Sequence, residues 1–138
     1  MKFFWIFSCL FVLNGAALKA QDTLSLYQAY PSFSDREKAE WTNFQNKWKY
    51  VYYPALKQGH HIKRLDCSTC KSFYAELYIE INAMGNVSKA ICVHAMHCGL
   101  AARDLRAYQD FEESVRGQHF AVLRNKSFIL RLGEVLGC

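Results

Sequence analysis

Cysteine spacing constrains this chain more than any other feature of its sequence. Cys67 and Cys70 form a C-x2-C pair, and Cys138 closes a segment of 72 residues that begins at Cys67. A disulfide between the two ends of that segment would hold it as one compact body, because it removes much of the freedom of the unfolded chain. Whether such a bond forms depends on the compartment in which the chain folds.

The N-terminus predicts a secretory leader over residues 1–20. A positive start at Met1-Lys2 precedes the apolar run 3–13, and small residues follow before two possible cleavage points, after Ala17 or after Ala20, of which Ala20 is preferred. The apolar run is shorter than the roughly 20 residues needed to span a bilayer. We therefore expect a secreted (extracellular) or lysosomal protein whose thiols tend to pair.

Removal of the leader changes both the charge and the cysteine count. Lys2 and Lys19 leave, so 15 of the 17 basic residues remain against 12 acidic ones, a formal charge of +3. This mild excess gives no reason to expect a nucleic-acid partner. Cys9 also leaves, and the odd number of five remaining cysteines predicts one thiol outside intramolecular disulfides, or a bridge to another chain.

Residues 21–65 are expected to form an N-terminal extension. Ser34 and Glu37 fit a capping box at a helix start. Aromatic residues at helical spacing then predict an amphipathic helix over about 35–52, which packs on the rest of the protein or contacts a partner. These aromatic residues are Trp41, Phe44, Trp48 and Tyr52. Pro54 is expected to end the helix, and residues 54–65 to form a linker.

Residues 66–138 are expected to form an all-α bundle of four to five amphipathic helices. The predicted helices lie before Gly85-Asn86, over about 88–99, before Gly117, and over about 120–136. Their apolar positions are Phe73, Leu77, Ile81 and Met84; Ile91, Ala95 and Cys98; Leu105, Tyr108, Phe111 and Val115; and Phe120, Leu123, Phe128, Ile129, Leu132, Val135 and Leu136. No segment is expected to form a strand.

Hairpin geometry predicts which cysteines can pair. If the first two helices form an antiparallel hairpin that turns near Gly85, the position level with Cys70 is about 101. Along the helix axis, at 1.5 Å per residue, Cys98 then lies about 4.5 Å from the level of Cys70, and Cys92 lies about 13.5 Å from it. We therefore expect a Cys70–Cys98 disulfide, which leaves Cys67 for Cys138 and Cys92 as the odd thiol.

This arrangement resembles the saposin-like domain family. The resemblance lies in the opening Cys67-x2-Cys70, in Cys98, in the terminal Cys138, and in the Asn86-Val87-Ser88 sequon between the first two predicted helices. Family members usually carry six cysteines in three bridges, whereas Gln109 and Leu132 stand near two of the expected positions here. The resemblance implies a helical fold that opens to expose an apolar face.

The function that this resemblance implies is non-catalytic binding of lipid or of an anionic membrane surface. The expected lipid-binding residues are Phe73, Leu77, Ile81, Leu105, Phe111, Phe120, Leu123, Ile129 and Leu132. Basic residues that could meet anionic headgroups are Arg103, Arg106, Arg116, Arg124, Lys126 and Arg131. On this interpretation Phe73→Asp would abolish lipid uptake. Asn86 is the expected glycosylation site, and Asn125-Lys126-Ser127 is a second sequon that could lie inside a helix and stay unmodified.

Three alternatives remain open at this point. The chain could be a helical, disulfide-linked protein that binds another protein, or its own copy, through Cys92 or the aromatic N-terminal helix. A zinc site is chemically conceivable but disfavoured by the leader; its ligands would come from Cys67, Cys70, Cys92, His94, His97 and Cys98. No catalytic motif is recognisable, so neither an enzyme nor a cofactor is expected.

Overall fold

The computed structural model describes residues 23–101 and 106–138, and it contains both helices and strands. The helices are α1 (Leu26–Ala29), α2 (Asp35–Lys47), α3 (Tyr53–Gly59) and α4 (Arg106–Arg116). The strands are β1 (Ser72–Ile81), β2 (Val87–His97), β3 (Leu100–Ala101) and β4 (Lys126–Val135). Among the described residues, no helix is long and apolar enough to cross a membrane.

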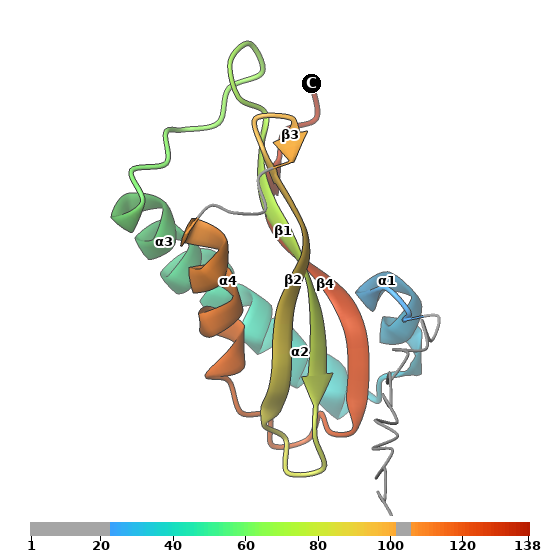
Figure 1. The fold of residues 1–138 in the computed structure, drawn as a ribbon. Coiled ribbons are helices and arrows are strands. Elements are labelled where there is room, and N and C mark those ends of the chain that lie inside the picture. The colour runs from blue at the N-terminus through green and yellow to red at the C-terminus, as the bar shows by residue number, and fades with distance from the viewer. Residues whose placement is uncertain (1–22, 102–105) are drawn as a thin grey trace, which may run out of the picture.

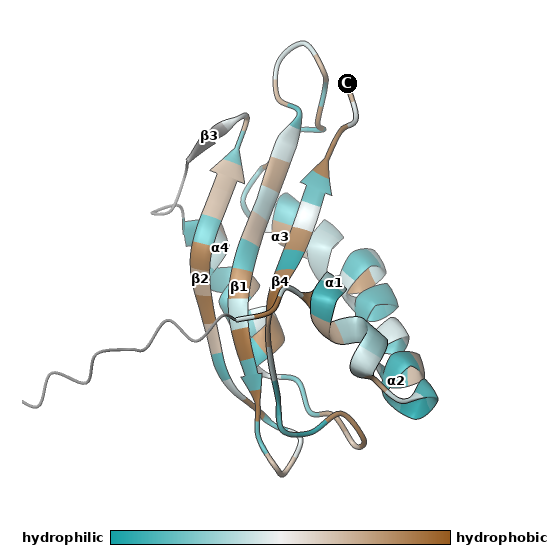
Figure 2. Cartoon of the chain, turned by 90° about the vertical axis from the view of Figure 1, so that its right-hand side faces the viewer, coloured by the Kyte–Doolittle hydropathy of each residue, from teal (hydrophilic) through white to brown (hydrophobic). Residues whose placement is uncertain are grey.

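The four strands form one antiparallel sheet in the order β3-β2-β1-β4. Helices α2, α3 and α4 cover one face of this sheet, and Figure 2 shows no helix of the described residues over the other face. The core lies between the two layers and is rich in aromatic rings; Trp48, for example, packs on Phe111 at 5.5 Å between ring centroids. The molecule is therefore a two-layer α+β domain.

The expectation of an all-α bundle was wrong, and β1 shows why. Phe73, Leu77 and Ile81 are four residues apart, a spacing that fits one face of a helix and equally one face of a strand. Ala75 and Ile79 decide between the two structures, because they are also fully buried and complete a strict alternation. The intervening residues from Tyr74 to Glu80 are half-buried on the opposite face of the sheet.

Bulges in β2 explain why a helix was wrongly expected over about 88–99, and the helix expected over about 120–136 was wrong as well. The β1–β2 register shifts at Glu76/Leu77 and again at Glu80/Ile81, and each bulge inserts one residue into β2. The buried positions of β2 therefore do not alternate regularly, and they imitate a helical period. In β4 the buried residues do alternate, at Phe128, Leu130 and Leu132.

The predicted N-terminal helix is present but continues beyond Pro54. Ser34 and Glu37 form the expected capping box at the start of α2. A π-helical turn, Trp48–Tyr52, separates α2 from α3, and Pro54 stands in the first turn of α3, where its missing N–H costs little. Residues 54–59, expected in a linker, are thus helical. Trp41 and Trp48 are buried in the same core as the sheet, so residues before and after position 65 form one body.

Two disulfides join the ends of this body. Cys67 bonds to Cys138 and Cys70 bonds to Cys98, which are the two expected pairs. Disulfides of this kind form in an oxidising, extracellular-type compartment. Cys92 takes part in neither bond and is buried, and its thiol donates a weak hydrogen bond to the carbonyl of His94, with sulfur and oxygen 3.4 Å apart.

Candidate functional site: a cationic pocket

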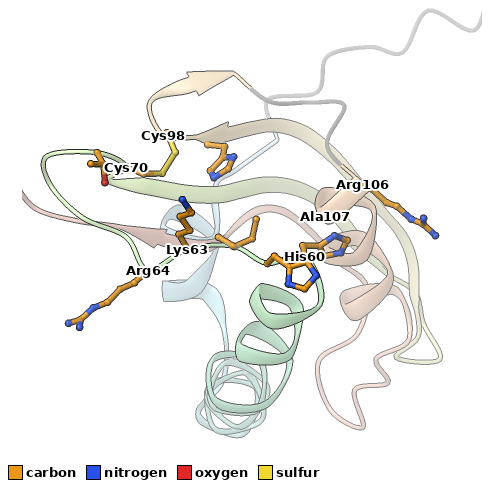
Figure 3. A pocket seen from close by; sticks show the side chains of 11 residues that line it. His60, Lys63, Arg64, Cys70, Cys98, Arg106 and Ala107 are labelled. Atoms are coloured by element: carbon orange, nitrogen blue, oxygen red, sulfur yellow. A yellow bond between two sulfur atoms is a disulfide. The ribbon is translucent and has the colours of Figure 1, made fainter.

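A pocket with many basic side chains lies where the C-terminal end of α3, the N-terminal end of α4 and the end of β2 meet. Its volume is about 650 Å³. Figure 3 shows its lining, which we call the cationic pocket: His60, His61, Ile62, Lys63, Arg64, Thr69, Cys70, His97, Cys98, Arg106 and Ala107. Six of these eleven residues are basic and none is acidic, so the lining favours a negatively charged ligand.

The end of α3 places the first group of basic residues. The backbone N–H of Ile62 donates to the carbonyl of Lys57 at 2.8 Å, and His61 adopts a left-handed conformation with φ of 53°. This geometry ends the helix and turns the chain across the pocket. Leu65 is buried and anchors the end of the segment, so that Lys63 and Arg64 remain on the surface.

The Cys70–Cys98 disulfide forms one wall of the pocket and fixes the position of His97. Cys98 donates its backbone N–H to the carbonyl of Ser72 at 2.8 Å. The Ser72 hydroxyl, which is buried, accepts a hydrogen bond from the backbone N–H of Gly99 at 2.9 Å. The His97 ring packs edge-on against Phe73, with centroids 5.4 Å apart. His97 is therefore held by the hydrophobic core below it.

Helix α4 closes the pocket on the remaining side. A hydrogen bond between His60 Nε2 and Asp110 Oδ2 ties the end of α3 to α4. Asp110 does not line the pocket. Arg64 and Arg106 reach outward on opposite sides of it in the view of Figure 3, so they form a rim rather than a floor. Their guanidinium groups point away from each other and add positive charge at the edge of the pocket.

The zinc interpretation does not agree with the arrangement of these groups. Among the described residues, one cluster has metal-ligand geometry: the donor atoms of Cys70, His97 and Cys98 lie within 4.8 Å of one another. Two of the three donors are joined in a disulfide and offer no thiolate. Cys67 is bonded to Cys138, and Cys92 lies inside the core.

The residues expected to bind lipid lie mostly in the closed core. Ile129 is half-buried on the open side of the sheet, and Leu105 lies outside the described residues. Six of the others are at most 2% exposed, and Leu132 is 6% exposed. The six are Phe73, Leu77, Ile81, Phe111, Phe120 and Leu123. Lipid uptake through these side chains stays a prediction that requires the core to open.

Most of the basic residues expected at a membrane surface already have partners. Arg116 pairs with Glu112, Lys126 with Glu37, and Arg131 with Glu76. The Arg124 Nε donates to the carbonyl of Ala121 at 3.0 Å. Arg103 lies outside the described residues. Of the predicted set, Arg106 is the one that lines the cationic pocket.

The surfaces predicted for a protein partner also face inward. Cys92 is 7% exposed and lies against the helical layer, where its backbone N–H donates to Glu112 Oε1 at 2.7 Å. Trp41, Phe44 and Trp48 point into the core. Contact with a partner through these residues stays a prediction, and their burial does not support it.

Sequence reasoning missed the cationic pocket, although the sequence carried a signal for it. His60-His61-Ile62-Lys63-Arg64 contains four basic residues in five positions. The run lies inside the segment 54–65, where Pro54 predicts a linker. A basic run of this kind is a recognised indication of an anionic partner. What the sequence did not indicate is that His97 and Arg106 would be brought beside it.

Comparisons with known proteins do not indicate what the pocket binds, so its function has to be inferred from its own residues. No family model, curated protein or solved structure was found to match this chain. The similarity to saposin-like domains is thus limited to cysteine spacing and one sequon. The sheet does not agree with the helical fold that the similarity implies.

Proposed function

We propose that this protein is a secreted, non-catalytic binding protein that holds the phosphate group of an anionic lipid in the cationic pocket. The observation that carries the proposal is the lining itself, which contains six basic residues and no acidic one; Asp110 contacts one of the six, His60, from outside the lining. Lys63, Arg64 and Arg106 are charged at neutral pH. Ile62, Ala107 and the disulfide add apolar surface next to these charges, which suits a ligand with both an anionic and an apolar part.

Binding is a simpler use of this lining than catalysis. Both cysteines of the pocket are in a disulfide, so neither supplies a thiolate nucleophile. Basic groups at the rim can attract a phosphate by Coulomb forces without any exact placement of reacting atoms. Secretion or routing to a lysosome is part of the same proposal, supported by the predicted leader and by the oxidising compartment that the disulfides indicate.

Charge reversal at the rim is expected to weaken binding to anionic vesicles. The variant Lys63→Glu/Arg64→Glu should bind phosphatidylglycerol vesicles at least about 30-fold more weakly, since each basic residue near an anionic surface contributes about 1 kcal/mol. Vesicle co-sedimentation measures the change, with phosphatidylcholine vesicles as the neutral reference. The matched control, Arg36→Glu/Lys49→Glu, alters net charge equally on exposed positions of the N-terminal helices. Equal loss in both variants would contradict a localised site.

Inorganic phosphate separates a lipid site from a general phosphate site. If the apolar part of the ligand contributes, millimolar inorganic phosphate should displace vesicles poorly at constant ionic strength. Complete displacement would show that the pocket recognises the anion alone. Absence of binding by the folded wild-type protein to either probe would refute the proposed function.

The turn beside the pocket should stay folded in mildly acid solution. Ser68 donates hydrogen bonds to the Asp66 carboxylate from both its hydroxyl and its backbone N–H, and these bonds lower the pKa of Asp66 below the usual 3.8. A lowered pKa means that the stabilisation is present above 3.8 and is lost only as the pH falls further. Between pH 7.5 and 5.5 this turn should therefore keep its stabilisation.

A further inference from the structure

Both Asn-x-Ser sequons of the chain lie at the end of the sheet opposite the cationic pocket (Figure 1). Asn86 stands in the turn between β1 and β2, and Asn125 directly precedes β4. Strand β2 runs from this end to the pocket, a distance of about 35 Å for its eleven residues. The second sequon is not inside a helix, contrary to the possibility considered from the sequence.

The two turns that carry the sequons are fixed to each other by backbone hydrogen bonds. The N–H of Phe120 donates to the carbonyl of Gly85 at 2.8 Å, and the N–H of Asn125 donates to the carbonyl of Asn82 at 3.3 Å. Gly85 has φ of +83°, and a Cβ there would come within 1.8 Å of the Phe120 oxygen. Only glycine permits this close contact, so the β1–β2 turn and the segment after α4 form one rigid tip.

A carboxylate on α2 anchors the same tip from the helical layer. Glu40 accepts backbone hydrogen bonds from Ala121, from Val122 at 3.0 Å, and from Leu123 at 2.8 Å. The segment that leads to Asn125 is therefore held in place. The orientation of Asn125 follows from the fold rather than from a freely moving loop.

Both asparagines present their side chains to solvent. Asn86 and Asn125 are exposed, as are the serines at the third sequon positions, Ser88 and Ser127. His119 Nδ1 lies 3.0 Å from Asn86 Oδ1 and leaves the amide nitrogen of Asn86 unused. Within the described part of the chain, neither asparagine uses its Nδ2 in a hydrogen bond. Asn125 has φ of 51°, a left-handed conformation that asparagine tolerates in exposed turns.

We propose that Asn86 and Asn125 are both N-glycosylated, so that two oligosaccharides cover the tip while the cationic pocket stays accessible. The oligosaccharide donor belongs to the class of lipid-linked oligosaccharyl diphosphates. The chain encounters this donor when the predicted leader directs it into the secretory pathway. The bond between Nδ2 and the C1 of the first sugar forms, and the bond from C1 to the diphosphate oxygen breaks. The lipid diphosphate departs, and Nδ2 loses one proton. Because the folded tip buries neither asparagine, both modified side chains fit the native structure.

The test is site-specific labelling of the full chain secreted by animal cells. Enzymatic release of N-glycans in ¹⁸O water converts each glycosylated asparagine to labelled aspartate, which peptide mass spectrometry locates. Wild type should show label at positions 86 and 125. Asn86→Gln should lose the first label, and Ser127→Ala should lose the second while keeping Asn125 itself. Asn43→Gln, an exposed asparagine outside any sequon, should keep both labels.

Label at Asn86 alone, or at neither site, in secreted and folded protein would overturn the proposal of two glycans. A second measurement tests the placement of the glycans: their removal should leave binding to phosphatidylglycerol vesicles unchanged within about twofold. A larger change would contradict the separation of the tip from the pocket. Labelling does not depend on lipid binding, so failure of the proposed function would leave this result intact.

Discussion

Replacing Cys67 and Cys138 by serine is expected to lower the free energy of unfolding by about 4 kcal/mol. The disulfide spans a sequence separation of 71, so its loss restores a large amount of freedom to the unfolded chain. In the native state little should change, because the strands it connects stay paired: the N–H of Leu136 donates to the carbonyl of Lys71 at 2.8 Å. A loss of this size is a large share of the 5–15 kcal/mol typical of a domain.

Urea unfolding followed by circular dichroism measures this change, with the slope of the transition as a check that both proteins unfold to similar extents. Cys70→Ser/Cys98→Ser is the matched comparison. Its separation of 28 predicts a smaller loss, about 3.5 kcal/mol, together with a distorted cationic pocket. A loss below about 1 kcal/mol for Cys67→Ser/Cys138→Ser would show that the fold holds its two ends together without the bond.

The disulfide pairing could be predicted from the sequence even though the secondary structure was wrong. The prediction used a helical hairpin that turns near Gly85, whereas the structure has a hairpin of two strands there. Any antiparallel hairpin with this turn brings Cys70 close to Cys98, whatever its rise per residue. The agreement therefore supports the position of the turn and says nothing about helix or strand.

The sheet could have been recognised in β1 but hardly in β2. Residues 73–81 alternate apolar and polar or amphipathic side chains, and Ala75 and Ile79 are the positions that separate a strand from a helix. In β2 the two bulges place buried residues at Val87, Ala90 and Cys92, a pattern that no simple period describes. Pairing with β1 determines where the bulges form, and the local sequence of β2 does not indicate this pairing.

The cationic pocket could be predicted only in part. The basic run at 60–64 is visible in the sequence, but its partners His97 and Arg106 come from segments more than thirty positions later. Their meeting depends on the sheet and on the Cys70–Cys98 disulfide. A fold predicted as a helical bundle therefore gave no reason to place these residues together.

Phe73→Asp is expected to prevent folding, and this changes what that variant can test. Phe73 is fully buried and packs against the rings of Tyr108 and Phe111, at 5.6 and 5.5 Å between centroids. Truncation to alanine should already cost about 4 kcal/mol, and an unpaired buried carboxylate costs several kcal/mol more. Loss of lipid binding in Phe73→Asp would therefore report unfolding rather than loss of a lipid-binding side chain.

The control for this prediction is Phe73→Leu, which keeps an apolar side chain and should cost about 1 kcal/mol while leaving vesicle binding unchanged. Thermal and urea unfolding of both variants measures the difference. If Phe73→Asp kept a cooperative transition and the native circular dichroism, Phe73 would not belong to a closed core, and lipid uptake through the apolar residues would regain support. If Phe73→Asp unfolds and Phe73→Leu binds vesicles normally, the protein binds vesicles through its surface, where the cationic pocket lies.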